Sequence, residues 1–139
     1  MRIHQIILSL IFLCGCSNQG DIMEKDSKEI TLSTGNQFAS ALVENRYSDA
    51  CSMLTAELQK SWPPEKLESR YKEMIAYGGE PVIVDGHTAF MDNWPDKKTG
   101  DIGWVYVSVS GNTFGEAVTL IVTIEMGEPK IRNIEWGRP

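Results

Sequence analysis

The sequence predicts an α+β fold in which three N-terminal helices pack on one face of a curved four-stranded antiparallel sheet. Between residues 33 and 77, apolar residues recur every three to four positions, which is the period of an amphipathic helix. After Gly79 the period becomes two, as in a strand, and turn sequences divide the rest of the chain. With 139 residues, 42% of them hydrophobic, the chain is long enough for one core.

Residues 1–15 have the features of an export signal. A short start carrying Arg2 is followed by the apolar run QIILSLIFLCG. A membrane-spanning helix needs about 20 apolar residues, whereas a shorter run of this kind is typical of a secretory signal. No second such run exists in the sequence.

The end of this run, LCGC, resembles a bacterial lipobox, with apolar Leu13 and a small residue before Cys16. Cys14 departs from the Ala, Ser or Thr usual at its position. The resemblance implies that residues 1–15 are a cleaved lipoprotein signal peptide and that Cys16 becomes the lipidated first residue. The alternative, a metal site on Cys14 and Cys16, needs about two more ligands, and beyond residue 16 the chain offers only Cys51 and His87.

Lipidation of Cys16 would place the protein in the cell envelope, because two or three acyl chains give stable anchoring. Ser17 rather than Asp after the cysteine implies the outer membrane, facing the periplasm, if the cell is Gram-negative. Residues 16–32 are polar and aperiodic, so we expect the lipidated cysteine and a flexible tether there, followed by one domain over residues 33–139. A net charge of −6 without a basic cluster excludes nucleic acid as a partner.

Three helices are expected in order. The first is indicated by the spacing of Phe38, Ala41 and Leu42, and the second begins with Ser48 as a candidate N-cap. The second carries an apolar stripe of Cys51, Leu54 and Leu58. The third begins at Pro63–Pro64 and ends before Gly78–Gly79. Its expected buried face is Leu67, Tyr71, Met74 and Ile75.

Four strands are expected after the helices, in meander order. The first, within residues 80–94, contains Asp85–Gly86, which we interpret as a bulge. The others lie within residues 102–110, 116–126 and 130–136, separated by turns at Gly111–Asn112 and Gly127–Pro129. One face of the third strand is wholly apolar and the other is mixed, which is typical of a sheet covered by helices on one side.

This order of elements resembles the NTF2-like (cystatin-like) superfamily. The segment FASALVENRYSDACSMLTAELQKSWPPEKLESRYKEMI carries most of the resemblance, which covers residues 33–137. The resemblance implies a cone between sheet and helices. In that superfamily the cone serves enzymes, scaffolds, peptidoglycan-associated modules and toxin-immunity proteins alike, so the fold alone does not set the function.

The candidate binding residues are mostly aromatic: Trp62, Trp104, Tyr106 and Trp136, together with His87. Aromatic side chains often anchor interfaces. Trp104 and Tyr106 alternate with Val105, Val107 and Val109, so they either line the core or cone or form an open face of the sheet. Trp136 is expected to close the mouth of the cone.

No catalytic, metal or cofactor site is predicted, because serine-nucleophile, zinc, phosphate-loop and dinucleotide motifs are absent from the sequence. Cys51 is expected to be a buried small hydrophobe rather than a nucleophile. The leading hypothesis is therefore a non-enzymatic, membrane-tethered binder of an envelope protein or small ligand, one version being an immunity protein against an envelope-acting toxin. Two alternatives stay open. One is a structural subunit of an envelope assembly, and the other is an isomerase or hydrolase using Asp85 and His87, which requires both side chains inside a concave pocket.

Overall fold

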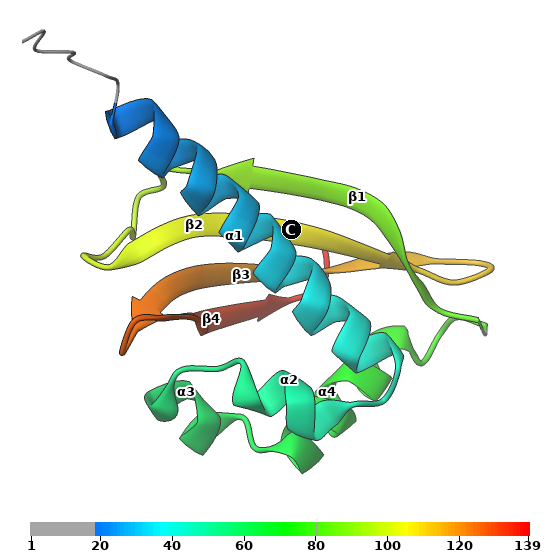
Figure 1. The fold of residues 1–139 in the computed structure, drawn as a ribbon. Helices are drawn as coiled ribbons and strands as arrows, with labels where there is room; N and C mark the ends of the chain where they lie inside the picture. The colour runs from blue at the N-terminus through cyan, green and yellow to red at the C-terminus, as the bar shows by residue number, and fades with distance from the viewer. Residues whose placement is uncertain (1–18, 80) are drawn as a thin grey trace, which may run out of the picture.

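The structure is a computed structural model that describes residues 19–79 and 81–139, with side chains from Lys25 onward. The predicted signal peptide and the predicted lipidation site at Cys16 lie outside the described residues. A long helix crosses one face of a sheet, and three shorter helices lie beside its end (Figure 1). No helix in the described part of the chain combines the length and apolar character needed to cross a membrane.

The sheet contains β1 (Ile83–Met91), β2 (Asp101–Ser110), β3 (Gly115–Glu125) and β4 (Glu128–Trp136). All neighbours are antiparallel and the spatial order equals the chain order. The predicted α+β class with one four-stranded antiparallel sheet is therefore confirmed. The predicted bulge is also present, because the β1–β2 register shifts between Val84 and Thr88, and Gly86 has a φ of 82°.

The described residues form four helices instead of the predicted three: α1 (Gln19–Val43), α2 (Tyr47–Ser52), α3 (Ala56–Ser61) and α4 (Pro64–Ile75). The prediction was wrong for the second helix, which is interrupted at Leu54 by a parallel bridge to Ile131. The Thr55 N–H donates to the Ile131 carbonyl at 2.9 Å, and the Thr55 side chain then accepts from Leu58 N to begin α3. The N-cap of α2 is Arg46 rather than Ser48.

The expected flexible tether is the second correction, because α1 is already helical from Gln19. Thr31, inside the expected tether, is fully buried. The polar residues before it can join the helix at little cost, since adding residues to an existing helix costs far less than starting one. The packed half of α1 supplies that start, and the folded domain therefore begins well before residue 33.

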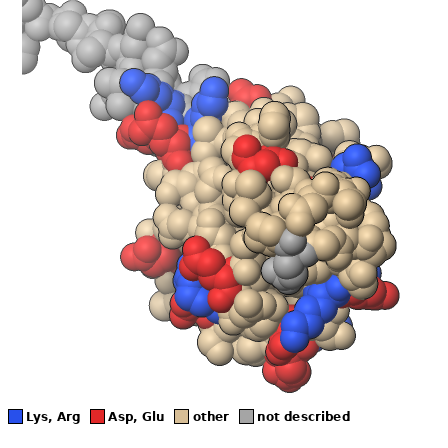
Figure 2. Space-filling view, turned by 90° about the vertical axis from the view of Figure 1, so that its right-hand side faces the viewer, with Lys and Arg blue, Asp and Glu red and all other residues tan. Residues whose placement is uncertain are grey.

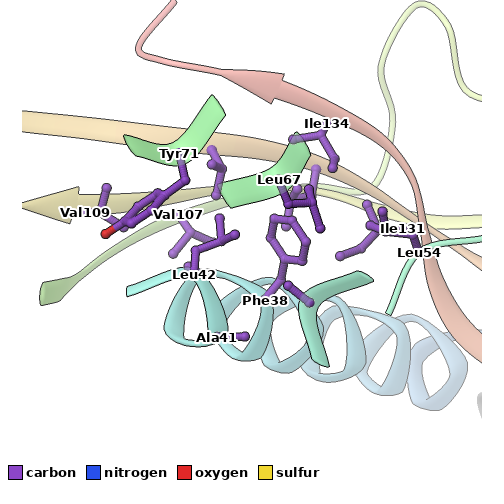
Figure 3. Close-up of a cluster of buried hydrophobic side chains, with 14 of the residues drawn as sticks. Phe38, Ala41, Leu42, Leu54, Leu67, Tyr71, Val107, Val109, Ile131 and Ile134 are labelled. Atoms are coloured by element: carbon purple, nitrogen blue, oxygen red, sulfur yellow. The ribbon is translucent and has the colours of Figure 1, made fainter. Parts of the chain in front are cut away.

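The core fills the space between the helices and one face of the sheet (Figure 3). Phe38 and Leu42 of α1 meet Leu67 and Tyr71 of α4 there, and valines of β2 and β3 lie beneath them. Gly35 lets α1 approach β2 closely, because a Cβ at Gly35 would lie 2.8 Å from Val105 Cγ1. Fully buried side chains thus fill the space between the sheet and the helices, where the resemblance implied a cone.

Candidate functional site

The two faces of β2 have opposite surroundings, which decides between the alternatives for its aromatic residues. Val105, Val107 and Val109 belong to the core under the helices. Successive side chains of a strand point to opposite faces, so Trp104 and Tyr106 lie on the other face. None of the described helices packs on that face, and both aromatic residues are partly exposed. The open-face alternative is the one found.

The pairing of the strands identifies the neighbours of these aromatics, because directly opposed residues share a face. Trp104 lies between Met91 of β1 and Ile121 of β3, and Tyr106 lies between Ala89 and Thr119. We call these six residues the helix-free face. Ile121 and Thr119 are only 6% and 4% exposed, although no described helix lies over them. Neighbours on the same face therefore shield these two side chains: Trp104 and Tyr106 on β2, and Asn133 and Glu135 on β4.

Asp85 and His87 lie at the β1 border of this face. The Asp85 carboxylate accepts the Ser108 hydroxyl at 2.8 Å and the His87 N–H at 2.9 Å, and its Oδ1 lies 3.0 Å from His87 Nδ1. Burial alone would raise the pKa of Asp85, but the hydrogen bonds from His87 and Ser108 outweigh it and hold the pKa below its ordinary value. The carboxylate therefore acts as an acceptor that fixes the bulge.

The His87 side chain is 85% exposed. The enzyme alternative required Asp85 and His87 inside a concave pocket, and this requirement is not met. A general base must come within hydrogen-bond reach of the proton that it removes from a bound substrate, and the exposed His87 imidazole lies at the edge of the sheet rather than in a pocket that could hold one. The hydrogen bonds between Asp85 and His87 stabilise the bulge of β1, and this structural role accounts for the pair.

Trp62 and Trp136 lie together, away from the helix-free face. Their ring centroids are 5.4 Å apart, and the Lys66 ammonium lies 4.8 Å from the centroid of Trp62. Both rings pack against the core cluster, and Trp136 lies opposite Val118 on the helix side of the sheet. The five predicted binding residues thus fall into two groups: Trp104, Tyr106 and His87 on one side, and Trp62 with Trp136 on the other.

Cys51 lies beside the Trp62–Trp136 group. Its Sγ is 3.6 Å from the Trp62 carbonyl, and burial raises the pKa of the thiol. A thiol with a raised pKa holds less of the reactive thiolate form. Cys51 is partly rather than fully buried and packs against the core cluster, so the expectation of a buried small hydrophobe is met only in part.

A buried ion pair that the sequence did not indicate holds one end of the sheet. Arg132 Nε and Nη2 donate to the two carboxylate oxygens of Asp101 at 2.6 and 2.5 Å, and the Asp101 side chain is 0% exposed. Arg132 Nη2 also donates to the Asp96 carbonyl at 3.2 Å. Burial would raise the pKa of Asp101, but the Arg132 and Lys98 hydrogen bonds outweigh it and lower the pKa. The pair fastens the β1–β2 connection to β4.

A second exposed surface lies at the end of the molecule formed by the β2–β3 hairpin. Seen from that end, most of the described surface is uncharged, and the charged residues lie mainly toward the rim apart from one acidic patch nearer the centre (Figure 2). Tyr77 is 62% exposed, and its ring contacts that of Phe114 with centroids 5.3 Å apart. The Tyr77 hydroxyl also donates to Glu116.

Comparisons with known protein families, with curated proteins and with solved structures find no match to this chain. Among the described residues, no group of three or more His, Cys, Asp or Glu side chains is arranged to hold a metal ion. The candidate site therefore rests on geometry alone. The helix-free face contains Trp104 and Tyr106, and with His87 at its border it brings together three of the five predicted binding residues.

Proposed function

We propose that this protein is a lipid-anchored, non-enzymatic binding module of the cell envelope with an NTF2-like domain, and that it binds a partner protein through the helix-free face. The anchor is supported by the LCGC sequence ending at Cys16 after a short apolar run. The observation that carries the binding role is that Trp104 and Tyr106 lie on a sheet face that none of the described helices covers.

The composition of the face supports a protein partner. Aromatic residues and Met are enriched in interfaces, whereas the charged residues Lys, Glu and Asp are depleted there. The six residues of the helix-free face include Trp104, Tyr106, Met91 and Ile121, and none of the six is charged. On β4, Glu135 lies opposite Thr119 at the border of the face. A partially exposed aromatic pair over a shielded apolar centre is the arrangement expected of an interface hot spot.

The anchor is tested by two cysteine variants. Cys16→Ala removes the acceptor of the lipid and is expected to move the protein from the membrane to the soluble fraction. Cys14→Ala is the matched control, because Ala is usual at that place in lipoboxes, and it should remain membrane-bound. A Cys16→Ala protein that still sediments with membranes as strongly as the Cys14→Ala protein would refute the anchor.

The partner is tested by crosslinking in cells. A photoreactive amino acid at Tyr106 is expected to give a discrete crosslinked product, and the same group at Glu57 is the control, since its side chain is 85% exposed on α3. Trp104→Ala should weaken the Tyr106 product, because truncating an interface hot spot typically costs about 2 kcal/mol or more. Equal products from both positions, or none from Tyr106, would count against a binding role for this face.

A further inference from the structure

We infer that the β3–β4 hairpin tip, centred on Met126, is a membrane contact that orients the anchored domain, with its apolar side chain inserted into the lipid surface. The inference rests on the proposed lipidation of Cys16, because that anchor decides which end of the domain faces the bilayer. It adds a second contact, made by the folded domain itself, to the covalent one.

The length of chain between the anchor and the fold limits how far the domain can stand from the membrane. Only Ser17 and Asn18 separate Cys16 from Gln19, where α1 begins. Three Cα-to-Cα steps span roughly 11 Å at most. A flexible tether of about fifteen residues would allow any orientation, whereas this short connection holds the start of α1 next to the lipid headgroups.

Two connections of the sheet lie at the same end of the molecule as the start of α1 (Figure 1). One is the β1–β2 connection. Ser27 of α1 lines a surface hollow together with Asp92 and Lys97 of that connection, and Lys28 lies 5.9 Å from the Phe90 ring centroid. The other is the β3–β4 hairpin. On that side, Ile30 of α1 lines a hollow with Pro129 and Lys130 of β4.

The tip of the β3–β4 hairpin exposes the large apolar side chain of Met126 to solvent. Met126 is 99% exposed, the highest value among the large hydrophobic residues that the structure describes as exposed, and Ile124 beside it is 42% exposed. Glu125 pairs with Glu128, which leaves Met126 and Gly127 as the two central residues of the turn.

The backbone of the turn makes the choice of Met more unusual. Met126 and Gly127 have φ values of 51° and 79°. Turns with two positive φ values strongly prefer Asn-Gly, Asp-Gly or Gly-Gly, and a left-handed conformation is unfavourable for a residue such as Met. An apolar side chain is thus held fully exposed at a position where local structure favours a small polar residue. A contact with acyl chains accounts for both features.

The charges around the tip indicate that apolar insertion, rather than attraction to anionic lipid, provides the contact. Lys130 and Arg132 follow the tip, but the Lys130 ammonium donates to the Ser52 carbonyl and Arg132 is paired with Asp101. Glu125 and Glu128 flank the tip. The Glu125 carboxylate is held by the Ala56 N–H at 3.0 Å. The anchor keeps the hairpin at a high effective concentration near the membrane, so that one inserted side chain is enough to bias the orientation.

The experiment uses the lipidated protein in phosphatidylcholine vesicles that contain a lipid with a quencher on its acyl chain. A fluorescent reporter is attached through Asn93→Cys at the end bearing Met126, or through Asn112→Cys at the opposite hairpin, each in a Cys51→Ala background. The reporter at position 93 should be quenched at least about twofold more strongly than the reporter at position 112. Interfacial contacts reach only about 5–10 Å into the boundary between headgroups and acyl chains, so the opposite end of the domain stays out of range of the quencher. Adding Met126→Asn should reduce the quenching at position 93 toward that at position 112.

The failure of this inference differs from the failure of the proposed anchor. If Cys16 carries no lipid and the protein does not bind vesicles, the proposed function has failed. If the protein is lipidated and vesicle-bound, equal quenching at both reporters, or quenching at position 93 that Met126→Asn leaves unchanged, overturns the membrane contact alone.

Discussion

Thr31 of α1 lies directly on Gly103 of β2. A Cβ at Gly103 would lie 2.6 Å from Thr31 Cγ2 and 2.6 Å from Phe90 Cε2, and Thr31 is fully buried. A glycine at this place is what allows the early part of α1 to reach the sheet. This contact makes residues that look like a linker part of the folded domain.

Gly103→Ala tests this contact. The added methyl group must displace Thr31 or Phe90, and overpacking of this kind typically costs about 1–3 kcal/mol of the free energy of unfolding. Gly115→Ala is the matched control in β3, since a Cβ there meets nothing within 4 Å. Chemical denaturation of the Cys16→Ala protein measures both. Equal stability of the two variants would show that α1 does not pack on Gly103.

Hydrogen exchange tests the length of α1. The amides of residues 29–34 should exchange slowly, similarly to those of residues 37–43, because both stretches are hydrogen-bonded within one helix that packs on the sheet. A flexible tether would instead exchange these amides as fast as the unfolded chain in denaturant. Exchange measured residue by residue separates the two outcomes.

Asp101→Asn tests the buried ion pair. Removing one partner leaves Arg132 without its counter-charge, and breaking buried pairs in this way costs about 3–5 kcal/mol. Because Asn at position 101 can keep part of these hydrogen bonds, we expect the free energy of unfolding to fall by an amount near the lower end of that range. Asp92→Asn, in the β1–β2 connection that precedes Asp101, is the control and should change the free energy of unfolding by less than about 0.5 kcal/mol.

The same pair predicts a dependence of stability on pH. The pKa of Asp101 is lowered in the folded protein from its model-compound value of 3.8. Its contribution to stability is therefore fully present above that value and is lost as the pH falls through the lower, folded pKa. The stability difference between the natural protein and Asp101→Asn should narrow below about pH 4. A difference that stays constant down to acid unfolding would contradict the lowered pKa.

Met126→Asn should stabilise the domain in solution. Asn tolerates the left-handed conformation that costs an ordinary residue about 1–2 kcal/mol, so a gain of about 1 kcal/mol is expected in thermal or chemical unfolding. Met126→Lys is the control, because it removes the apolar side chain without favouring that backbone conformation. If both variants gained equally, exposure of the thioether rather than the backbone would be the cause.

The general architecture could be predicted because its signals are local. The change of period after Gly79, the Pro63–Pro64 start of the last helix and the Asp85–Gly86 bulge each depend on residues close in sequence. Local signals could not predict which side of β2, that of Val105 or that of Trp104, faces the helices. Both sides of β2 are apolar enough to be buried, so only the packing of α1 against Val105 decides which side faces the helices.

The errors come from contacts between distant residues. The second helix is interrupted because Leu54 forms a β-bridge with Ile131, far along the chain, and the residues around Leu54 do not by themselves predict that bridge. The start of α1 was missed because its polar residues have no buried face of their own until Thr31 meets β2. Asp101 and Arg132 are separated by 31 positions, and neither stands in a motif.

The measurement that tests the central claim most directly is the mass of the N-terminal peptide of the protein purified from membranes. The account predicts a peptide that begins at Cys16 and carries a diacylglyceryl group, with or without an added acyl chain on its amine. A peptide that begins at any other residue, or an unmodified Cys16, would contradict the lipid anchor and with it the placement of this protein in the cell envelope.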